Sequence, residues 1–173
     1  MPAKQYVYLQ GKCKWCRHRM PEHDPYGNVR WSVELIPTPE SLAIIRDLQK
    51  LQDGVQGIKN TLRQTDDGYI IRFGRPQNKT MRGTQVAFTP PEARDKNGLP
   101  MGDVNIGNGS DVTIKLEVYK HKTPLGKQAR AVRWEAIQVD NLVPYDTHSD
   151  YKPEENKAFE GMDKIPIQTI SKF

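Results

Sequence analysis

Alternating apolar and polar residues predict that most of this chain forms β-strands. Over residues 29–35, valine, tryptophan and leucine alternate with Arg30, Ser32 and Glu34. Over residues 111–119, Val, Ile and Leu alternate with Thr, Lys and Glu. A period of two residues is typical of a strand buried on one face. Together with less regular β-rich runs, this pattern predicts strands at residues 5–18, 29–36, 68–75, 84–89, 111–119 and 129–139.

One amphipathic helix is predicted between the second and third strands. Thr38 is suited to the N-cap and Pro39 to the first helical position. Apolar residues then recur every three positions, which predicts a helix over 39–52 with one apolar stripe. A weaker helical turn is expected to continue through 55–62, so that the whole helical insertion covers about 38–62.

The order of these elements predicts a mainly β protein. Six or so strands, one helix and no βαβ rhythm are typical of a small five- to six-stranded Greek-key barrel with an inserted helix. The first two strands are expected to pair as a long hairpin, and residues 90–110, rich in Pro, Gly and Asp, as a surface excursion. Residues 1–145 are interpreted as one domain, and residues 146–173 as an extended C-terminal tail, partly disordered or in contact with a partner or another subunit.

The distribution of charge favours a polyanionic partner. Of 173 residues, 26 are Lys or Arg and 21 are Asp or Glu, a net charge of +5. Residues 1–145 hold 22 of the basic and 15 of the acidic residues, a net +7, and residues 146–173 hold 4 and 6, a net −2. No apolar run reaches the ~18 residues that a membrane span needs, so no membrane partner is expected. Two cysteines are too few for a disulfide scaffold and indicate a reducing cytoplasm.

Catalytic and metal-binding motifs are weak. Cys13 and Cys16 have zinc-ligand spacing, with His18 and His23 following. The histidines come too soon after Cys16 for a finger, and on an extended strand the two cysteines are expected on opposite faces. We therefore predict no metal, no cofactor and no enzyme. The alternative is a metal-dependent nuclease or recombination enzyme, which would need a carboxylate such as Asp111 or Glu135.

Basic residues interleaved with aromatic ones are the strongest chemical signal. Cations neutralise phosphates, and rings stack on bases without reading sequence. A duplex hides its base faces, so this combination favours single strands, with RNA binding on the same surface as another alternative. The predicted nucleic-acid-binding residues are Lys12, Lys14, Trp15, Arg17, Arg72, Phe73, Arg75, Lys115, Tyr119, Lys120, Lys122, Arg130, Arg133 and Trp134.

The aromatic residues differ in what their strand positions predict. Trp31 shares a face with valines and leucine and is expected in the core. Trp134 alternates with Val132, so it fits the core at least as well as a stacking platform. Trp15 is open to either role, and Tyr119 is expected to point outward.

Six segments follow one another along the chain: GKCKWCRHR, VRWSVELIPTPES, DGYIIRFGRP, PPEARDKNGLP, IGNGSDVTIKLEVY and ARAVRWEAIQVDNLVPY. In this order, and over about residues 5–145, they resemble the bacteriophage-encoded single-stranded DNA-binding proteins built on an oligonucleotide-binding (OB) fold. The resemblance implies an OB barrel that coats single-stranded DNA, without catalysis, during phage DNA replication, recombination and repair. It also implies a location in the cytoplasm of the infected bacterial host.

The end of the chain departs from that pattern. Proteins of this kind usually end in a strongly acidic tail that recruits replication partners, which here would be a phage polymerase, helicase or recombinase. The last stretch, GMDKIPIQTISKF, is nearly neutral, although it ends in Phe173. Its apolar residues instead favour packing on a neighbouring subunit in a homo-oligomer, and they are Ile165, Ile167, Ile170 and Phe173.

Overall fold

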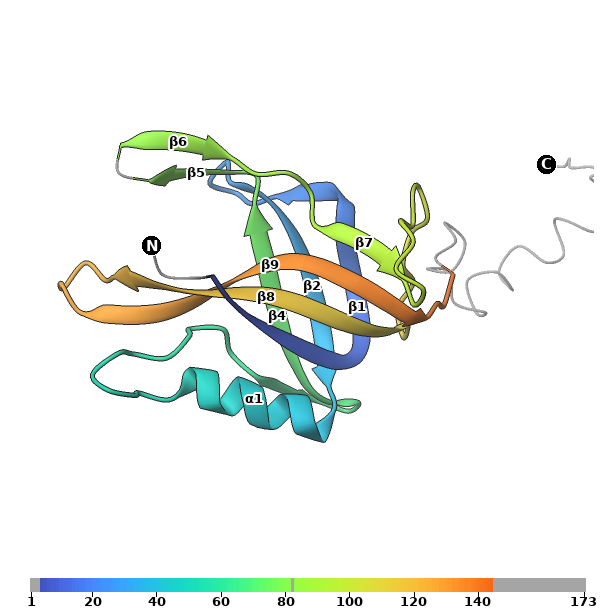
Figure 1. The fold of residues 1–173 in the computed structure, drawn as a ribbon, viewed down its shortest axis with the longest axis horizontal. Helices are drawn as coiled ribbons and strands as arrows, with labels where there is room; N and C mark the ends of the chain where they lie inside the picture. The colour runs from blue at the N-terminus through green and yellow to red at the C-terminus, as the bar shows by residue number, and fades with distance from the viewer. Residues whose placement is uncertain (1–3, 82, 145–173) are drawn as a thin grey trace, which may run out of the picture.

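The computed structural model describes residues 4–81 and 83–144 and forms a partly open β-barrel with one helix (Figure 1). The predicted tail, including the strip from Ile165 to Phe173, lies outside these residues. The elements are β1 (Gln5–His23), β2 (Val29–Pro37), α1 (Pro39–Gln49), β3 (Arg63–Thr65), β4 (Gly68–Pro76), β5 (Asn78–Met81), β6 (Thr84–Ala87), β7 (Glu92–Asp95), β8 (Asp111–Lys122) and β9 (Gln128–Asn141).

A seven-stranded sheet in the order β3-β4-β2-β1-β8-β9-β7 makes up the barrel. Its five long strands follow the order of an OB fold. β1 pairs with β8 over Gln5–Lys12 and with β2 from Gly11 onward, so the strand changes partner near its middle. A Cβ on Gly11 would lie 2.1 Å from the Ile36 carbonyl oxygen, which is why this crossing point needs glycine.

Arg75 joins β4 and β9, the next-to-last strand at each end of the curled sheet. It lies on β4, and it donates a hydrogen bond from Nη1 to the Trp134 carbonyl oxygen of β9 at 3.3 Å. Its Nε donates to the Thr89 carbonyl oxygen at 2.7 Å, and its guanidinium pairs with Glu135 at 3.2 Å. With 8% of its surface exposed, Arg75 is an internal link that holds β4 against β9.

A stack of cations and aromatic rings extends from this link. The Phe88 ring contacts two guanidinium groups, with its centroid 5.1 Å from that of Arg75 and 4.7 Å from that of Arg133. Arg133 also covers the Tyr119 ring at 4.6 Å and pairs with Glu117 at 3.1 Å. Both members of this ion pair are buried, so Glu117 balances the charge of Arg133 inside the protein, although the buried Arg133 Nε has no hydrogen-bond partner among the described residues.

The apolar faces predicted from the alternation fill the barrel. Trp31 is 3% exposed, which confirms the core position predicted for it. Trp134 is fully buried, so it belongs to the core and is not a stacking platform. Buried side chains contribute roughly 1.5–3 kcal/mol each, so this set provides most of the stability. Its other main members are Leu9, Cys13, Val33, Leu35, Ile71, Phe73, Val112, Ile114, Leu116, Ile137 and Val139.

The helix begins as predicted but ends early. Thr38 caps α1, because its Oγ1 accepts a hydrogen bond from the Ser41 N–H at 3.2 Å. Ile45 and Leu48 are buried, whereas Leu51 lies beyond the helix and is 70% exposed. In the described parts of the chain, no helix is long and apolar enough to cross a membrane.

The predicted helical continuation, and with it a helical insertion over about 38–62, is wrong. The chain after α1 passes so close to the helix that a Cβ on Gly57 would lie 2.2 Å from the Gln49 backbone. Gln56 then bonds to β9, donating to the Gln128 carbonyl oxygen at 2.9 Å and accepting from the Arg130 N–H at 2.8 Å. Tertiary pairing with β9 thus replaces the helical hydrogen bonds.

Several strands differ from the prediction in length or role. β1 extends five residues past the predicted end at residue 18, and β8 and β9 are also longer than predicted. The strand predicted at 84–89 becomes β6, which pairs with β5 in a separate hairpin, on the side of the barrel opposite α1 in Figure 1. The predicted surface excursion contains β7, which pairs parallel with β9.

We expect Arg75→Met to lower the free energy of unfolding by about 1–3 kcal/mol, because two backbone carbonyls lose their donor. Chemical denaturation of the purified protein measures this loss. Arg94→Met is the matched control, since Arg94 is exposed, where it pairs with Glu92 and donates to the Gly98 carbonyl oxygen, and its loss should lower the free energy of unfolding much less. Equal effects of the two substitutions would contradict the role of Arg75 as the link between β4 and β9.

Candidate nucleic-acid interface

Three adjoining clefts run across the outer face of β1, β2 and β4. The first, of about 350 Å³, extends from Trp15 to Arg72. The second, of about 440 Å³, shares Glu34 and Arg72 with the first. The third, of about 700 Å³, shares Arg30 and Gly74 with the second and reaches the β5–β6 hairpin. We call this continuous depression the arginine groove, and its principal residues are Trp15, Arg17, Glu22, Arg30, Ser32, Glu34, Arg63, Arg72, Gly74 and Lys79.

The alternation of β2 and β4 builds the floor of the groove. On β2 the inward Trp31 and Val33 alternate with Arg30, Ser32 and Glu34, which face outward. On β4, Arg72 pairs in register with Glu34, and Gly74 pairs with Ser32. Alternate side chains of these two strands therefore form the core on one face and the groove on the other.

The groove is positively charged. Six cationic side chains and three carboxylates line it, and because Glu135 neutralises Arg75, the net charge is +2. A concave surface of one sign attracts a polyion of the other. The cations are Arg17, Arg30, Arg63, Arg72, Arg75 and Lys79, and the carboxylates are Glu22, Asp24 and Glu34.

A bulge in β1 places Trp15 at one end of the groove. The register between β1 and β2 shifts between Lys14 and Arg17, and Trp15 has a positive φ of 49°. Its N–H donates to Asn108 Oδ1 at 2.8 Å, which holds this conformation. The Trp15 side chain is consequently 52% exposed.

The same bulge overturns the prediction for the two cysteines. Because one extra residue enters the strand, Cys13 lies in the core and Cys16 packs against it, instead of on opposite faces. Burial raises the pKa of the Cys13 thiol to about 11 and also raises that of Cys16 well above its usual value. Among the described residues, no group of three His, Cys, Asp or Glu side chains is placed to hold a metal ion.

The candidate carboxylates for a metal-dependent reaction lie apart and are each paired. Asp111 pairs with Lys12 at 2.9 Å, and hydrogen bonds from Lys12 and then Asn141 lower its pKa. Glu135 pairs with Arg75. Asp111 is opposite Asn141, six residues along β9 from Glu135, which is about 20 Å at the rise of a strand.

Part of the predicted site comes together in the groove. Trp15, Arg17 and Arg72 line one cleft, and Lys14 lies nearby, paired with Asp67 at 2.8 Å. Arg75 reaches the far cleft, although its charge is used inside the barrel.

Two of the predicted stacking rings are buried. Phe73 is 1% exposed and Trp134 is fully buried, so neither presents a ring to a base. The prediction that these two rings lie on the binding surface is therefore wrong, because both side chains occupy core positions of their strands.

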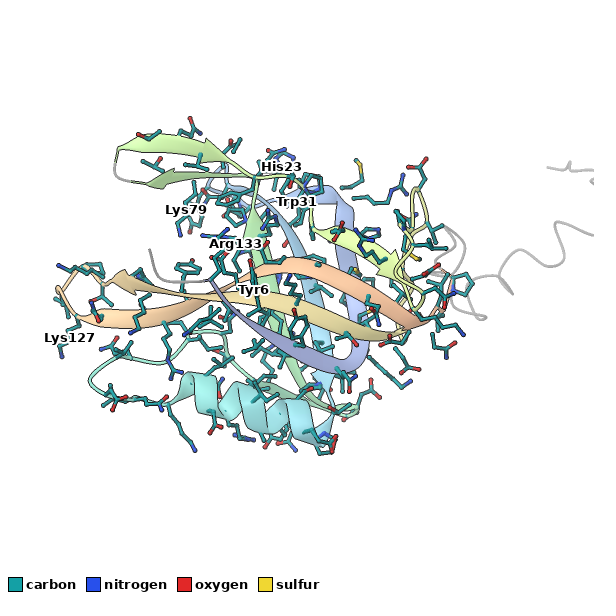
Figure 2. The ribbon with its side chains drawn as sticks, viewed as in Figure 1. Tyr6, His23, Trp31, Lys79, Lys127 and Arg133 are labelled. Atoms are coloured by element: carbon teal, nitrogen blue, oxygen red, sulfur yellow. The ribbon has the colours of Figure 1, made fainter. Side chains whose placement is uncertain are left out.

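Two of the predicted residues, Lys115 and Tyr119, lie outside the groove, on the outer face of β1 and β8. With Tyr6 and Tyr8, which were not predicted, they form what we call the tyrosine face, and the Lys115 ammonium lies 4.2 Å from the Tyr6 ring centroid. Lys79 connects it with the groove, because its ammonium lies 4.8 Å from the Tyr119 ring. Figure 2 shows Tyr6 and Lys79 on opposite sides of Arg133 in that view.

The remaining predicted residues belong to the β8–β9 hairpin. Lys120 and Lys122 lie on the arm that extends away from the barrel, with Lys127 at its tip (Figure 2). Arg130 instead donates to the carbonyl oxygens of Asp47 and Lys50 at 3.2 and 2.6 Å, and so binds the end of α1.

Sequence reasoning missed Arg30, Arg63, Lys79 and Tyr26. The alternation of β2 already placed Arg30 outward, whereas Arg63 and Lys79 join the groove through pairing of β3 and folding of the β5–β6 hairpin. Tyr26 is 88% exposed at the tip of the β1–β2 turn, where Asp24 accepts hydrogen bonds from the Tyr26 and Asn28 N–H groups. The turn-rich segment MPEHDPYGN is the sequence feature that could have indicated an exposed Tyr26.

The fold and the groove define a class of protein: an OB barrel with a basic groove on the face of its second and third long strands. No protein-family model and no curated protein matches the sequence. Among solved structures, the chain is similar to gp2.5, a single-stranded DNA-binding protein encoded by bacteriophage T7, with a TM-score of 0.61, 15% identity, and 90% of this chain and 94% of that chain covered.

It is also similar to the single-stranded DNA-binding protein from bacteriophage Enc34 in complex with single-stranded DNA, with a TM-score of 0.53 and 10% identity. That match covers 82% of this chain and 89% of the other. At these identities the similarity shows the fold, and the OB barrel predicted from the sequence is confirmed.

His18, beside Trp15 in a cleft of about 320 Å³, predicts a pH effect on stability. Desolvation, followed by the charge of Arg19, lowers the pKa of His18 below 6.5. The unfolded state therefore binds the proton more tightly than the native state. The contribution of neutral His18 to the free energy of unfolding is complete above about pH 6.5 and is lost as the pH falls toward the native pKa. In urea unfolding between about pH 7.5 and 5.5, the wild type should lose more stability than His18→Gln. The exposed His121→Gln should follow the wild type, and parallel curves for all three proteins would contradict the prediction.

Proposed function

We propose that this protein binds single-stranded DNA in the arginine groove without sequence preference. The observation that carries the proposal is the continuity of three clefts that together are positively charged, with an exposed tryptophan at one end. The groove crosses the second and third long strands, the face that OB folds use for oligonucleotides. The similarity in fold to two phage proteins named for this activity, one of them in complex with single-stranded DNA, supports it.

In this proposal the arginines bind the backbone and the exposed rings bind bases. Arg17, Arg30 and Arg72 contact phosphates and release counterions, which makes binding dependent on salt. Trp15 and Tyr26 stack on bases, each contributing on the order of 1–3 kcal/mol. Stacking needs bases free of a partner strand, so single strands are preferred to duplex. The tyrosine face extends the path beyond Lys79.

We further propose that the bound strand serves phage DNA replication, recombination and repair in the infected host's cytoplasm, with no reaction catalysed by this chain. A phage polymerase, helicase or recombinase is the partner class proposed for residues 146–173, and self-association through the same segment is its alternative. RNA shares the phosphates and base faces of DNA, so discrimination between them is an outcome of the experiment below.

Titration with a ~30-nucleotide oligo(dT) should quench the tryptophan fluorescence. Trp31 and Trp134 are buried, so the quenching is expected to come from Trp15, and Trp15→Phe should remove most of it while retaining binding in an anisotropy assay. Trp15→Ala should weaken binding by roughly 5- to 150-fold, the equivalent of one stacked base. Affinity should fall with salt by roughly 0.7 log units per phosphate contact for each tenfold increase.

The controls are duplex DNA, an RNA of equal length, and Lys96→Ala, whose exposed side chain lies in the turn after β7. Lys96→Ala should bind like the wild type, and duplex should bind more weakly than oligo(dT). Quenching that persists in Trp15→Phe, or binding that is insensitive to salt, would contradict the proposed site.

A further inference from the structure

Glu22 is a carboxylate surrounded by three arginines inside the groove. Its Oε1 accepts a hydrogen bond from the Arg30 Nε at 3.3 Å and from the Ser32 hydroxyl at 2.9 Å. Arg72 Nη2 also contacts Oε1, and the Arg17 Nε lies 3.9 Å from Oε2. One negative charge therefore holds three positive ones together.

An irregular stretch of β1 brings this cluster together. The register with β2 runs from Arg17 opposite Ser32 to Glu22 opposite Arg30, so β1 advances five residues while β2 advances two. The extra residues form the second bulge of β1 and place the Glu22 side chain over the outer face of β2.

The three guanidinium groups remain accessible to a ligand. The side chains of Arg17, Arg30 and Arg72 are 52%, 45% and 43% exposed, whereas that of Glu22 is 24% exposed. By contrast, Arg75 and Arg133 are less than a tenth exposed, and each faces its own carboxylate. The cluster around Glu22 thus has a surplus of two positive charges at the surface of a groove.

The arrangement around Glu22 resembles the way proteins hold a phosphate group. Guanidinium forks bind carboxylate and phosphate oxygens with the same geometry, and a hydroxyl donor completes both kinds of site. A carboxylate that already accepts these donors competes with a phosphate for them.

We propose that Glu22 occupies the position of one DNA backbone phosphate and that the incoming phosphodiester displaces it from Arg17, Arg30 and Arg72. This inference rests on the proposed function and adds a specific phosphate subsite to it. Glu22 is then an internal competitor, which weakens binding to every sequence alike and keeps the empty arginines from repelling one another.

Glu22→Gln tests the proposal in the full-length protein. Removing the competing charge should tighten binding of oligo(dT) by roughly threefold to tenfold near 0.1 M salt. It should also steepen the slope of log affinity against log salt concentration by up to about 0.7. Affinity is measured by fluorescence anisotropy at four salt concentrations, after a thermal melt has shown that the variant is folded.

Glu34→Gln is the matched control. Glu34 lines the same groove and pairs with Arg63 at 3.0 Å, so its substitution raises the charge of the groove by the same amount. The gain from Glu22→Gln should exceed that from Glu34→Gln.

The sign of the effect separates the two roles of Glu22. Weaker binding by Glu22→Gln would mean that the carboxylate organises the arginines for DNA, and a gain no larger than that of Glu34→Gln would mean a general effect of charge. Either result overturns the phosphate subsite while leaving the proposed function in place. If the wild type also failed to bind oligo(dT), the proposed function itself would be wrong.

Discussion

The closure of the barrel through Arg75 is the interaction on which the groove depends. Alternate residues of β4 point to opposite faces of the sheet: Phe73 and Arg75 face the interior, whereas Arg72 and Gly74 face the groove. The strand that forms the groove floor is therefore held in place from its other face. Because a buried guanidinium needs its partners, the link with β9 holds β4 in place, and with it Arg72 on the face of the groove.

Irregularity in β1 contributes the other half of the site. A regular strand would alternate its side chains between core and solvent, and it could not place Cys13 and Cys16 both inward with Trp15 outside. The first bulge exposes Trp15, and the second carries Glu22 over three arginines. Bulges next to functional surfaces commonly redirect side chains in this way.

The sequence predicted the core and the fold class because both follow from local alternation. Trp31 was confirmed in the core for this reason, and the cap at Thr38 was confirmed because capping depends on the residue types next to the helix start. The ion pair of Arg133 with Glu117 joins the neighbouring strands β8 and β9 and is not visible in the alternation of a single strand, so Arg133 was assigned to DNA although Glu117 balances its charge in a buried position. The bulges of β1 could not be predicted either, because they are defined by the register with β2 and not by the residues of β1 alone.

Composition likewise could not separate the two basic surfaces. Lys115 and Tyr119 belong to the tyrosine face, and Trp15 and Arg72 belong to the groove, although all four have the residue types of a nucleic-acid site. The groove is distinguished by concavity and by arginines that are partly free to reach a ligand. Pairing of β3 with β4 adds Arg63 to it, which a scan along the chain does not reveal.

Photocrosslinking with an oligo(dT) that carries 5-iodouracil would locate the strand on the protein. After digestion, mass spectrometry identifies the crosslinked peptides. We expect crosslinks at Trp15 and at Tyr26, which lie at the groove and at the turn beside it. Crosslinks confined to Tyr6 and Tyr8 would place the strand on the tyrosine face and contradict binding in the arginine groove.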